Sequence, residues 1–230
     1  MHCTFCLTSL RPVLNWTNLF AKQKSYLLCE ECLSKLEFII GERCSICSRP
    51  FANIDSHYKR GSLCLDCYKW EQDPNWKGVL DGNTSIFVYN DFLKEIIALF
   101  KYRGDHQVAG ALADFFPKSM VKGRVIAPIP LSDERLYERG FNQADAILDY
   151  ACLGYRQLLS RVHGEKQSKI SRHERLENTA VFSAANIEGC NAQHVLLVDD
   201  IYTTGATVRQ AAKVLKNAGA ITVASFTVAR

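Results

Sequence analysis

The stretch Val195-Leu-Leu-Val-Asp-Asp-Ile-Tyr-Thr-Thr-Gly-Ala-Thr207 decides the fold of this chain. Its first four residues form a short apolar run rich in Val and Leu, which is typical of a buried strand of parallel type. Two carboxylates, Asp199 and Asp200, end the run. The segment from Val208 to Ala218 then carries apolar residues at helical spacing. We therefore expect two acidic side chains at the carboxyl end of a strand, beside a turn that opens a helix.

The turn after the two aspartates has the composition of a phosphate site. Backbone N–H groups and hydroxyls at the start of a helix bind phosphate, helped by the positive end of the helix dipole. Asp199 and Asp200 would repel a bare phosphate, so the ligand must also offer hydroxyl donors or a divalent cation. A ribose 5-phosphate meets both demands. A Thr-capped helix beside two surface aspartates is the alternative, whereas the absence of a lysine after the turn glycine disfavours an ATPase loop. The turn consists of Thr203, Thr204, Gly205, Ala206 and Thr207.

The cysteines form a second pattern, far from the first in sequence. Two Cys-x-x-Cys turns supply the four thiolates of a closed structural zinc site. We expect about two such sites built from consecutive pairs, and a cross-braced pairing remains open. Disulfides are the alternative, disfavoured because the chain begins without the charged and apolar segments of an export signal. Eight of the 10 cysteines form these pairs, namely Cys3 with Cys6, Cys29 with Cys32, Cys44 with Cys47, and Cys64 with Cys67.

The formal net charge of +4 does not by itself indicate a nucleic-acid partner. Eight thiolates contribute −8 and two Zn²⁺ contribute +4, so the metal-loaded chain would be close to neutral. No apolar run approaches the length of a membrane helix. We expect a soluble, cytoplasmic protein without membrane insertion.

The order of apolar segments predicts an α/β fold in which strands and helices alternate. Such a pattern indicates a parallel sheet with helices on both faces and ligands at the carboxyl ends of the strands. We expect a cysteine-rich module over residues 1–70, a linker over 71–83 and the α/β domain over 84–230. The expected strands are 85–89, 124–129, 155–159, the run ending at Val198, and 221–228. The expected helices begin at Asn90 or Asp91, span 105–120 with a break near Pro117, span 142–152, and follow the turn described above.

Two further segments carry basic residues that suit phosphate groups. In the first, Arg135 and Arg139 follow a proline-fixed turn after a strand, and arginine makes bidentate contacts with phosphate. A solvated loop with a helix cap is the alternative for this segment. The second, Arg161 to Asn178, is long, basic and poor in apolar residues. It fits a lid that covers a pyrophosphate and a mobile surface loop equally well.

The segment His194 to Thr207 resembles the signature of type I phosphoribosyltransferases, which bind phosphoribosyl pyrophosphate (PRPP). The chain as a whole resembles the ComF family, of the late-competence ComFC type, in which a zinc module precedes a phosphoribosyltransferase domain. The resemblance covers nearly the whole chain. Besides the signature and the cysteine pairs, it rests on Phe100-Lys-Tyr-Arg-Gly104, Pro128-Ile-Pro130, Arg139-Gly-Phe-Asn-Gln143, and Lys166-Gln-Ser168 with Arg175.

This resemblance implies a ligand, a set of site residues and a biological setting. Asp199 and Asp200 would be the catalytic carboxylates on the ribose hydroxyls, and Mg²⁺ would accompany PRPP. The setting would be natural transformation, in which single-stranded DNA enters the cytoplasm beside a ComFA-type helicase. A non-catalytic PRPP or nucleotide sensor and a zinc-dependent DNA-binding scaffold are the alternatives, and the acceptor of a transfer reaction is not identified. The expected PRPP contacts are Thr203, Thr204, Gly205, Ala206, Thr207, Pro130, Arg135, Arg139, Lys166 and Arg175.

Overall fold

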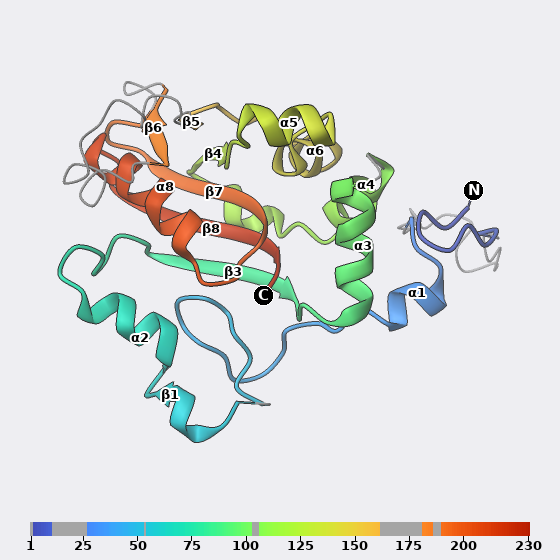
Figure 1. Cartoon of the computed structure of the whole chain (residues 1–230), viewed down its shortest axis with the longest axis horizontal. Coiled ribbons are helices and arrows are strands. Elements are labelled where there is room, and N and C mark those ends of the chain that lie inside the picture. Colours follow the sequence, from blue (N-terminus) through green and yellow to red (C-terminus); the bar gives the residue numbers. More distant parts are fainter. Residues whose placement is uncertain (1, 11–26, 53, 103–105, 162–180, 186–189) are drawn as a thin grey trace.

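A four-stranded, fully parallel sheet lies at the centre of the chain in the computed structural model (Figure 1). The structure describes residues 2–10, 27–52, 54–102, 106–161, 181–185 and 190–230. The strand order is β3-β8-β7-β4, which confirms the predicted parallel α/β sheet. The strands are β3 (Gly82–Phe87), β8 (Thr222–Ala229), β7 (His194–Ile201) and β4 (Val125–Pro128).

Strand β7 is apolar on both sides because both faces of the sheet are covered. Leu196 and Val198 belong to one hydrophobic core, and Val195 and Leu197 belong to the other. A parallel sheet buried in this way produces a continuous apolar run rather than an alternating one. The prediction of helices on both faces is therefore confirmed. Residues of α3 (Asp91–Tyr102), α4 (Gln107–Ala113) and α6 (Gln143–Tyr150) line the first core, and those of α8 (Ala206–Asn217) line the second.

Helix α3 begins where the sequence indicates. The side-chain oxygen of Asn90 accepts a hydrogen bond from the Leu93 amide at 2.9 Å, which satisfies one of the free donors of the first turn. The helix buries an apolar stripe against the sheet, formed by Leu93, Ile96, Ile97 and Phe100.

Two expected elements differ in the structure. The helix expected over 105–120 is shorter: α4 ends at Ala113, and a separate 3₁₀ turn (Lys118–Val121) follows Pro117, whose ring cannot continue a helix. The strand expected over 155–159 does not join the central sheet. Strand β5 (Leu159–Arg161) instead pairs antiparallel with β6 (Phe182–Ala184), and only the Arg156 amide bonds to β4, at the Ile126 carbonyl.

Helix α5 (Asp133–Arg139) was not predicted, although its signals are present in the sequence. The Ser132 hydroxyl caps its first turn, where two acidic residues favour the positive end of the helix dipole. Gly140 ends the helix in the left-handed conformation, at φ +77°. Arginines 135 and 139 therefore lie on a short helix rather than on an open loop.

The cysteine-rich region packs on both faces of the sheet. Its connector extends the β3 edge, because the Ile39 amide bonds to Ile86 O at 2.8 Å and the Val88 amide to Glu37 O at 2.8 Å. None of the helices in the described part of the chain is long and apolar enough to cross a membrane. The regular elements of this region are α1 (Glu30–Ser34), a 3₁₀ turn (Ser56–Tyr58), β1 (Lys59–Arg60), β2 (Leu63–Cys64) and α2 (Leu65–Gln72).

Candidate functional site

Two adjacent carboxylates lie near the end of strand β7, at the carboxyl edge of the sheet. Asp199 and Asp200 both belong to the strand, which runs on to Ile201. Asp200 is buried, and its Oδ2 lies 2.6 Å from Nζ of Lys101, in the last turn of α3. The ammonium group offsets the burial of one carboxylate, as a buried charge requires. Lys101 was not predicted as a site residue, although it belongs to the Phe100–Gly104 string quoted above.

Between described residues, Asp199 forms no ion pair like that of Asp200 with Lys101. Burial, followed by the neighbouring Asp200 charge, raises the pKa of Asp199 to about 8. Near neutral pH the Asp199 carboxyl is therefore protonated, while Asp200 forms the ion pair with Lys101. A ligand that binds the ionised carboxylate of Asp199 displaces that proton.

The turn after β7 leads directly into α8. Gly205 lies at φ +81°, and an added Cβ would overlap the Tyr202 hydroxyl and the Arg209 guanidinium, so only glycine fits. The Thr204 hydroxyl accepts a hydrogen bond from the Ala206 amide at 3.3 Å, and Gly205 is the N-cap residue of α8. The side chains of Thr203 and Thr207 are exposed. The turn therefore offers exposed threonine hydroxyls beside the amides at the start of a helix.

Two side chains hold the carbonyl groups of this turn from behind. Nη1 of Arg230 donates to Thr203 O at 2.7 Å, and Nε1 of Trp70 donates to Thr204 O at 3.1 Å. In a trans peptide the carbonyl and the following N–H point in opposite directions. The amides of Thr204 and Gly205 therefore point away from Arg230 and Trp70, as an anion-binding turn requires. Sequence reasoning gave neither Trp70 nor Arg230 a role at this turn.

The predicted basic residues are only partly brought to this site. Arg161, at the end of β5, lies within electrostatic range of both Arg135 and Asp199: burial and Arg135 lower the pKa of Arg161, and Asp199 raises it. Arg139 instead donates to Gln143 Oε1 at 2.8 Å and is held against α6.

The remaining predicted PRPP contacts belong to the proline turn and to the expected lid. Pro130 lies beside the end of β7, because the amide of its neighbour Ile129 bonds to Val198 O at 2.9 Å. Apart from Arg161, the expected lid from Arg161 to Asn178 lies outside the described residues, and so do Lys166 and Arg175.

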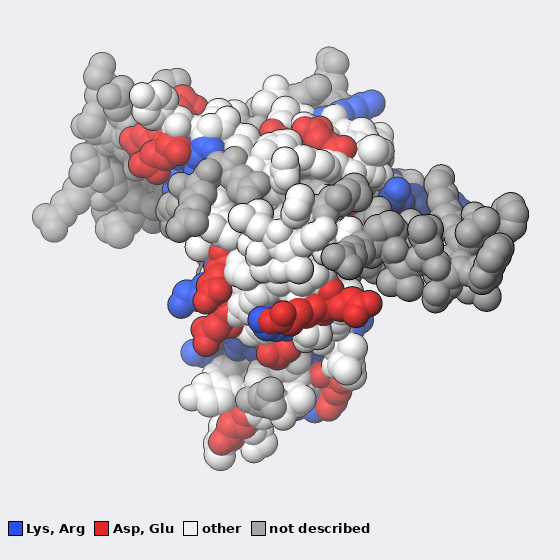
Figure 2. Space-filling view, turned by 90° about the vertical axis from the view of Figure 1, so that its right-hand side faces the viewer, with Lys and Arg blue, Asp and Glu red and all other residues white. Residues whose placement is uncertain are grey.

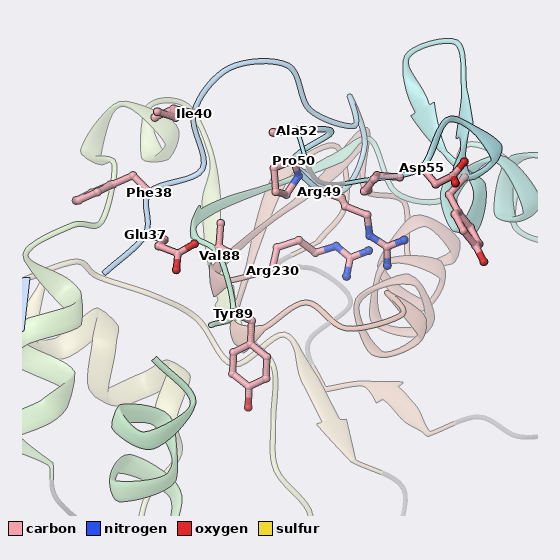
Figure 3. A pocket seen from close by; sticks show the side chains of 12 residues that line it. Glu37, Phe38, Ile40, Arg49, Pro50, Ala52, Asp55, Val88, Tyr89 and Arg230 are labelled. Atoms are coloured by element: carbon pink, nitrogen blue, oxygen red, sulfur yellow. The ribbon is translucent and has the colours of Figure 1, made fainter. Parts of the chain in front are cut away.

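A pocket of about 750 Å³ lies between the cysteine-rich region and the ends of β3 and β8, and Arg230 links it to the turn (Figure 3). Arg230 and Arg49 lie side by side in it, and the side chains of Phe38 and Tyr89 form other parts of its lining. Arg230 thus contacts both this pocket and the Thr203 carbonyl.

The eight paired cysteines form two groups of four. Within each group the sulfur atoms all lie within 4.8 Å of one another, and each group consists of consecutive pairs, as predicted. The cross-braced arrangement is therefore wrong. The Sγ atoms of Cys6 and Cys29 are 3.5 Å apart, and those of Cys47 and Cys64 are 3.6 Å apart. Four sulfurs bound tetrahedrally to one zinc ion would be separated by about 3.8 Å. Both groups could therefore bind zinc.

The two groups, called here the first centre (Cys3, Cys6, Cys29, Cys32) and the second centre (Cys44, Cys47, Cys64, Cys67), differ in their surroundings. The first centre packs against the core that contains α3, and its Cys6 is exposed. The second centre is fully buried in the core that contains α8. Two arginines donate to its sulfurs, Arg230 Nε to Cys47 at 3.5 Å and Arg209 Nη2 to Cys67 at 3.7 Å.

Comparison with known proteins agrees with this geometry. The family description "Phosphoribosyl transferase domain" matches residues 159–230, which include both aspartates and the turn. Competence protein ComFC of Bacillus subtilis is 35% identical over 99% of this chain and 94% of the relative. Competence protein ComFC of Streptococcus pneumoniae is 31% identical over the full length of both chains. DNA utilization protein YhgH of Salmonella typhi is 26% identical over 85% of this chain and 93% of the relative.

The two ComFC proteins exceed 30% identity over essentially the whole chain, and the turn, the paired carboxylates and both cysteine centres lie within the matched length. The chain belongs to the ComFC family and is a ComF-type, phosphoribosyltransferase-like protein.

Proposed function

We propose that this protein binds PRPP together with Mg²⁺ and transfers its phosphoribosyl group to an acceptor. The observation that carries the proposal is the pairing of two carboxylates with an amide-lined turn at the same edge of the sheet. The 5-phosphate would bind the amides of Thr204 and Gly205 and the hydroxyls of the turn. The ribose hydroxyls would donate to Asp199 and Asp200. A ligand with both groups satisfies the turn and the carboxylates at once.

The reaction would need positioning rather than a protein nucleophile. As pyrophosphate leaves, positive charge builds at the anomeric carbon, and the acceptor forms its new bond to that carbon. Asp199 and Asp200 would hold the sugar so that this carbon faces the acceptor. Mg²⁺ would neutralise part of the pyrophosphate charge while keeping several of its waters.

Basic residues near the carboxylates suit the leaving group. Lys101 and Arg161 both lie close to the aspartate pair, and Arg135 lies within range of Arg161. Arg139, Lys166 and Arg175 remain proposed contacts on the sequence evidence. A cationic lid that excludes water would limit hydrolysis of PRPP.

Isothermal titration calorimetry with PRPP and Mg²⁺ tests the binding step, with PRPP plus EDTA as the matched control. Acceptors would then be screened by the release of pyrophosphate. Binding without release for any acceptor would instead support a PRPP sensor that regulates a partner. No heat with PRPP and Mg²⁺ would contradict the proposed function.

The names of the relatives support a role in natural transformation. Two are called competence proteins and one a DNA utilization protein, so we infer a cytoplasmic role in the uptake of single-stranded DNA, beside a ComFA-type helicase. Direct binding of DNA is a weaker proposal. On the face shown in Figure 2, the described basic and acidic side chains are interspersed rather than gathered into a basic patch. Binding of an oligonucleotide that weakens steeply with salt would favour the DNA scaffold.

A further inference from the structure

The second centre and the phosphate turn are joined by direct contacts. Three side chains make them: Trp70 and Arg230 donate to carbonyls of the turn, and Arg209 donates to the Tyr202 hydroxyl that packs beneath Gly205. Arg230 and Arg209 donate at the same time to the sulfurs of Cys47 and Cys67. Trp70 lies three residues after Cys67 on the same helix, α2. Each of the three is thus bound to the turn or to Tyr202 at one end and tied to the second centre at the other.

Charge explains why arginines fill these places. Four thiolates and one Zn²⁺ carry a formal charge of −4 + 2 = −2. Arg209 is 0% exposed and Arg230 is mostly buried, and a buried guanidinium needs an anionic or strongly polar partner. Together they supply +2, which balances the loaded centre. Without the metal, nothing would hold the four sulfurs together, and both arginines would lose their sulfur acceptors.

Further contacts make the unit rigid. The Arg209 guanidinium lies over the Trp70 ring at 5.1 Å, and the Arg230 guanidinium over the Tyr202 ring at 5.1 Å. Asp66 lies 2.8 Å from Nη2 of Arg49 and 4.0 Å from Nη2 of Arg230, so it anchors the pair of arginines seen side by side in Figure 3.

The first centre has no comparable link. Between described residues, no hydrogen bond connects Cys3, Cys6, Cys29 or Cys32 to residues 202–205. Its neighbours are on the α3 face instead, where the rings of Phe5 and Phe92 lie 4.8 Å apart. The chain therefore supplies its own control centre for any test of the second.

We propose that Trp70, Arg209 and Arg230 are positioning residues that couple the second centre to the phosphate turn, so that phosphoribosyl binding requires metal at the second centre but not at the first. The proposal rests on the proposed function for the identity of the ligand. The coupling itself concerns the shape of the turn and can be measured without ligand.

The first experiment empties one centre at a time in the full chain. Cys47→Ser is compared with Cys29→Ser, with zinc content measured for each. Amide hydrogen exchange of residues 203–207 should rise in Cys47→Ser and stay at the parent level in Cys29→Ser. PRPP affinity should follow the same order. Equal exchange in the two variants, each with one zinc lost, would overturn the coupling.

The second experiment leaves all metal ligands in place, in case Cys47→Ser fails to fold. Trp70→Phe removes the indole N–H that donates to Thr204 O and keeps an aromatic ring. Trp76→Phe is the matched control: it makes the same substitution at a tryptophan whose ring centroid lies 5.2 Å from that of Trp70. Loss of one such hydrogen bond should weaken PRPP and ribose 5-phosphate about three- to tenfold, and by the same factor, because both carry the 5-phosphate. Trp76→Phe should bind both ligands like the parent.

Arg230→Gln provides the third variant, with the exposed Arg43→Gln as its control. Arg230→Gln should weaken both ligands at least tenfold and release zinc from the second centre at a lower chelator concentration. Parent-like affinity and parent-like exchange in both Trp70→Phe and Arg230→Gln would refute the proposal. If the parent itself binds neither ligand, the proposed function fails, and the exchange of residues 203–207 after emptying the second centre still decides the coupling.

Discussion

Binding of a ribose ligand should release a proton from Asp199. The pKa of this carboxyl is raised to about 8 by burial and by the Asp200 charge. A PRPP complex that uses Asp199 as an ionised carboxylate, which accepts ribose hydroxyls more strongly than the neutral acid does, holds no proton there. At pH 7 roughly 0.9 of a proton should therefore leave per PRPP bound, at pH 8 about half, and at pH 9 about 0.1. Affinity should rise about tenfold per pH unit below pH 8 and level off above it.

Calorimetry in buffers of different ionisation enthalpy counts these protons directly. Titrations between pH 7.5 and 9 avoid the second ionisation of the 5-phosphate, whose pKa lies near 6. Asp200→Asn removes the neighbouring charge, so the pKa of Asp199 should fall and the release should shift to lower pH. Lys101→Met removes the cation 2.6 Å from Asp200, so the pair should hold its proton to higher pH.

The raised pKa of Asp199 also predicts the direction in which folding stability changes with pH. The folded state holds the Asp199 proton more tightly than the unfolded chain, whose aspartates titrate near pH 3.9. The parent should therefore lose stability as pH rises from about 4 to about 8, and Asp199→Asn should lack this component. An enthalpy of PRPP binding that is the same in all buffers at pH 7.5 would refute the assignment of the proton to Asp199.

The remaining predictions concern the carboxylates, the turn and the metal. Asp199→Asn combined with Asp200→Asn should abolish Mg²⁺-dependent PRPP binding while leaving the circular dichroism spectrum unchanged; tight binding by this variant would exclude the ribose assignment. Gly205→Ala should destroy phosphate binding, because its Cβ overlaps Tyr202 and Arg209, whereas Gly123→Ala, also at positive φ but in open space, should only destabilise by about 1 kcal/mol. Elemental analysis of reduced protein should find about two zinc ions per chain, and chelation should unfold the region before Trp70. A value of zero would contradict the zinc assignment, and a value of one would mean that only one centre is loaded.

The central sheet could be predicted because its signals are local. The continuous apolar run from Val195 to Val198 indicates a strand buried on both faces, and the glycine and threonines after it indicate the start of a helix. Helix α5 has equally local signals, a capping serine at Ser132 and a left-handed glycine at Gly140, although it was not predicted. The boundaries 1–70, 71–83 and 84–230 stay a prediction.

Local sequence signals could not predict which cysteines share a metal centre or which residues surround the carboxylates. The spacing of the four Cys-x-x-Cys turns permits consecutive and cross-braced pairing alike. Lys101 reaches Asp200 because α3 packs against the first core, and Trp70 reaches Thr204 across 134 residues of chain. Such contacts depend on how the elements pack, which no periodicity in a single sequence specifies.

Arg209 is a buried charge on helix α8, a helix that the spacing of apolar residues predicts correctly. Its helix was predicted from Val208, Ala211, Ala212, Leu215 and Ala218, of which the first four are buried and Ala218 is partly buried. Arg209 is buried among them, on a helix face that should exclude a charge. Tyr202 cannot neutralise it, because burial raises the pKa of that hydroxyl and keeps it protonated. Among the described residues, the other hydrogen-bond acceptor of Arg209 is the sulfur of Cys67, so a negatively charged second centre accounts for the position of this arginine. The metal centre and the phosphate turn are therefore parts of one polar unit, built into the core that also holds α8 to the sheet.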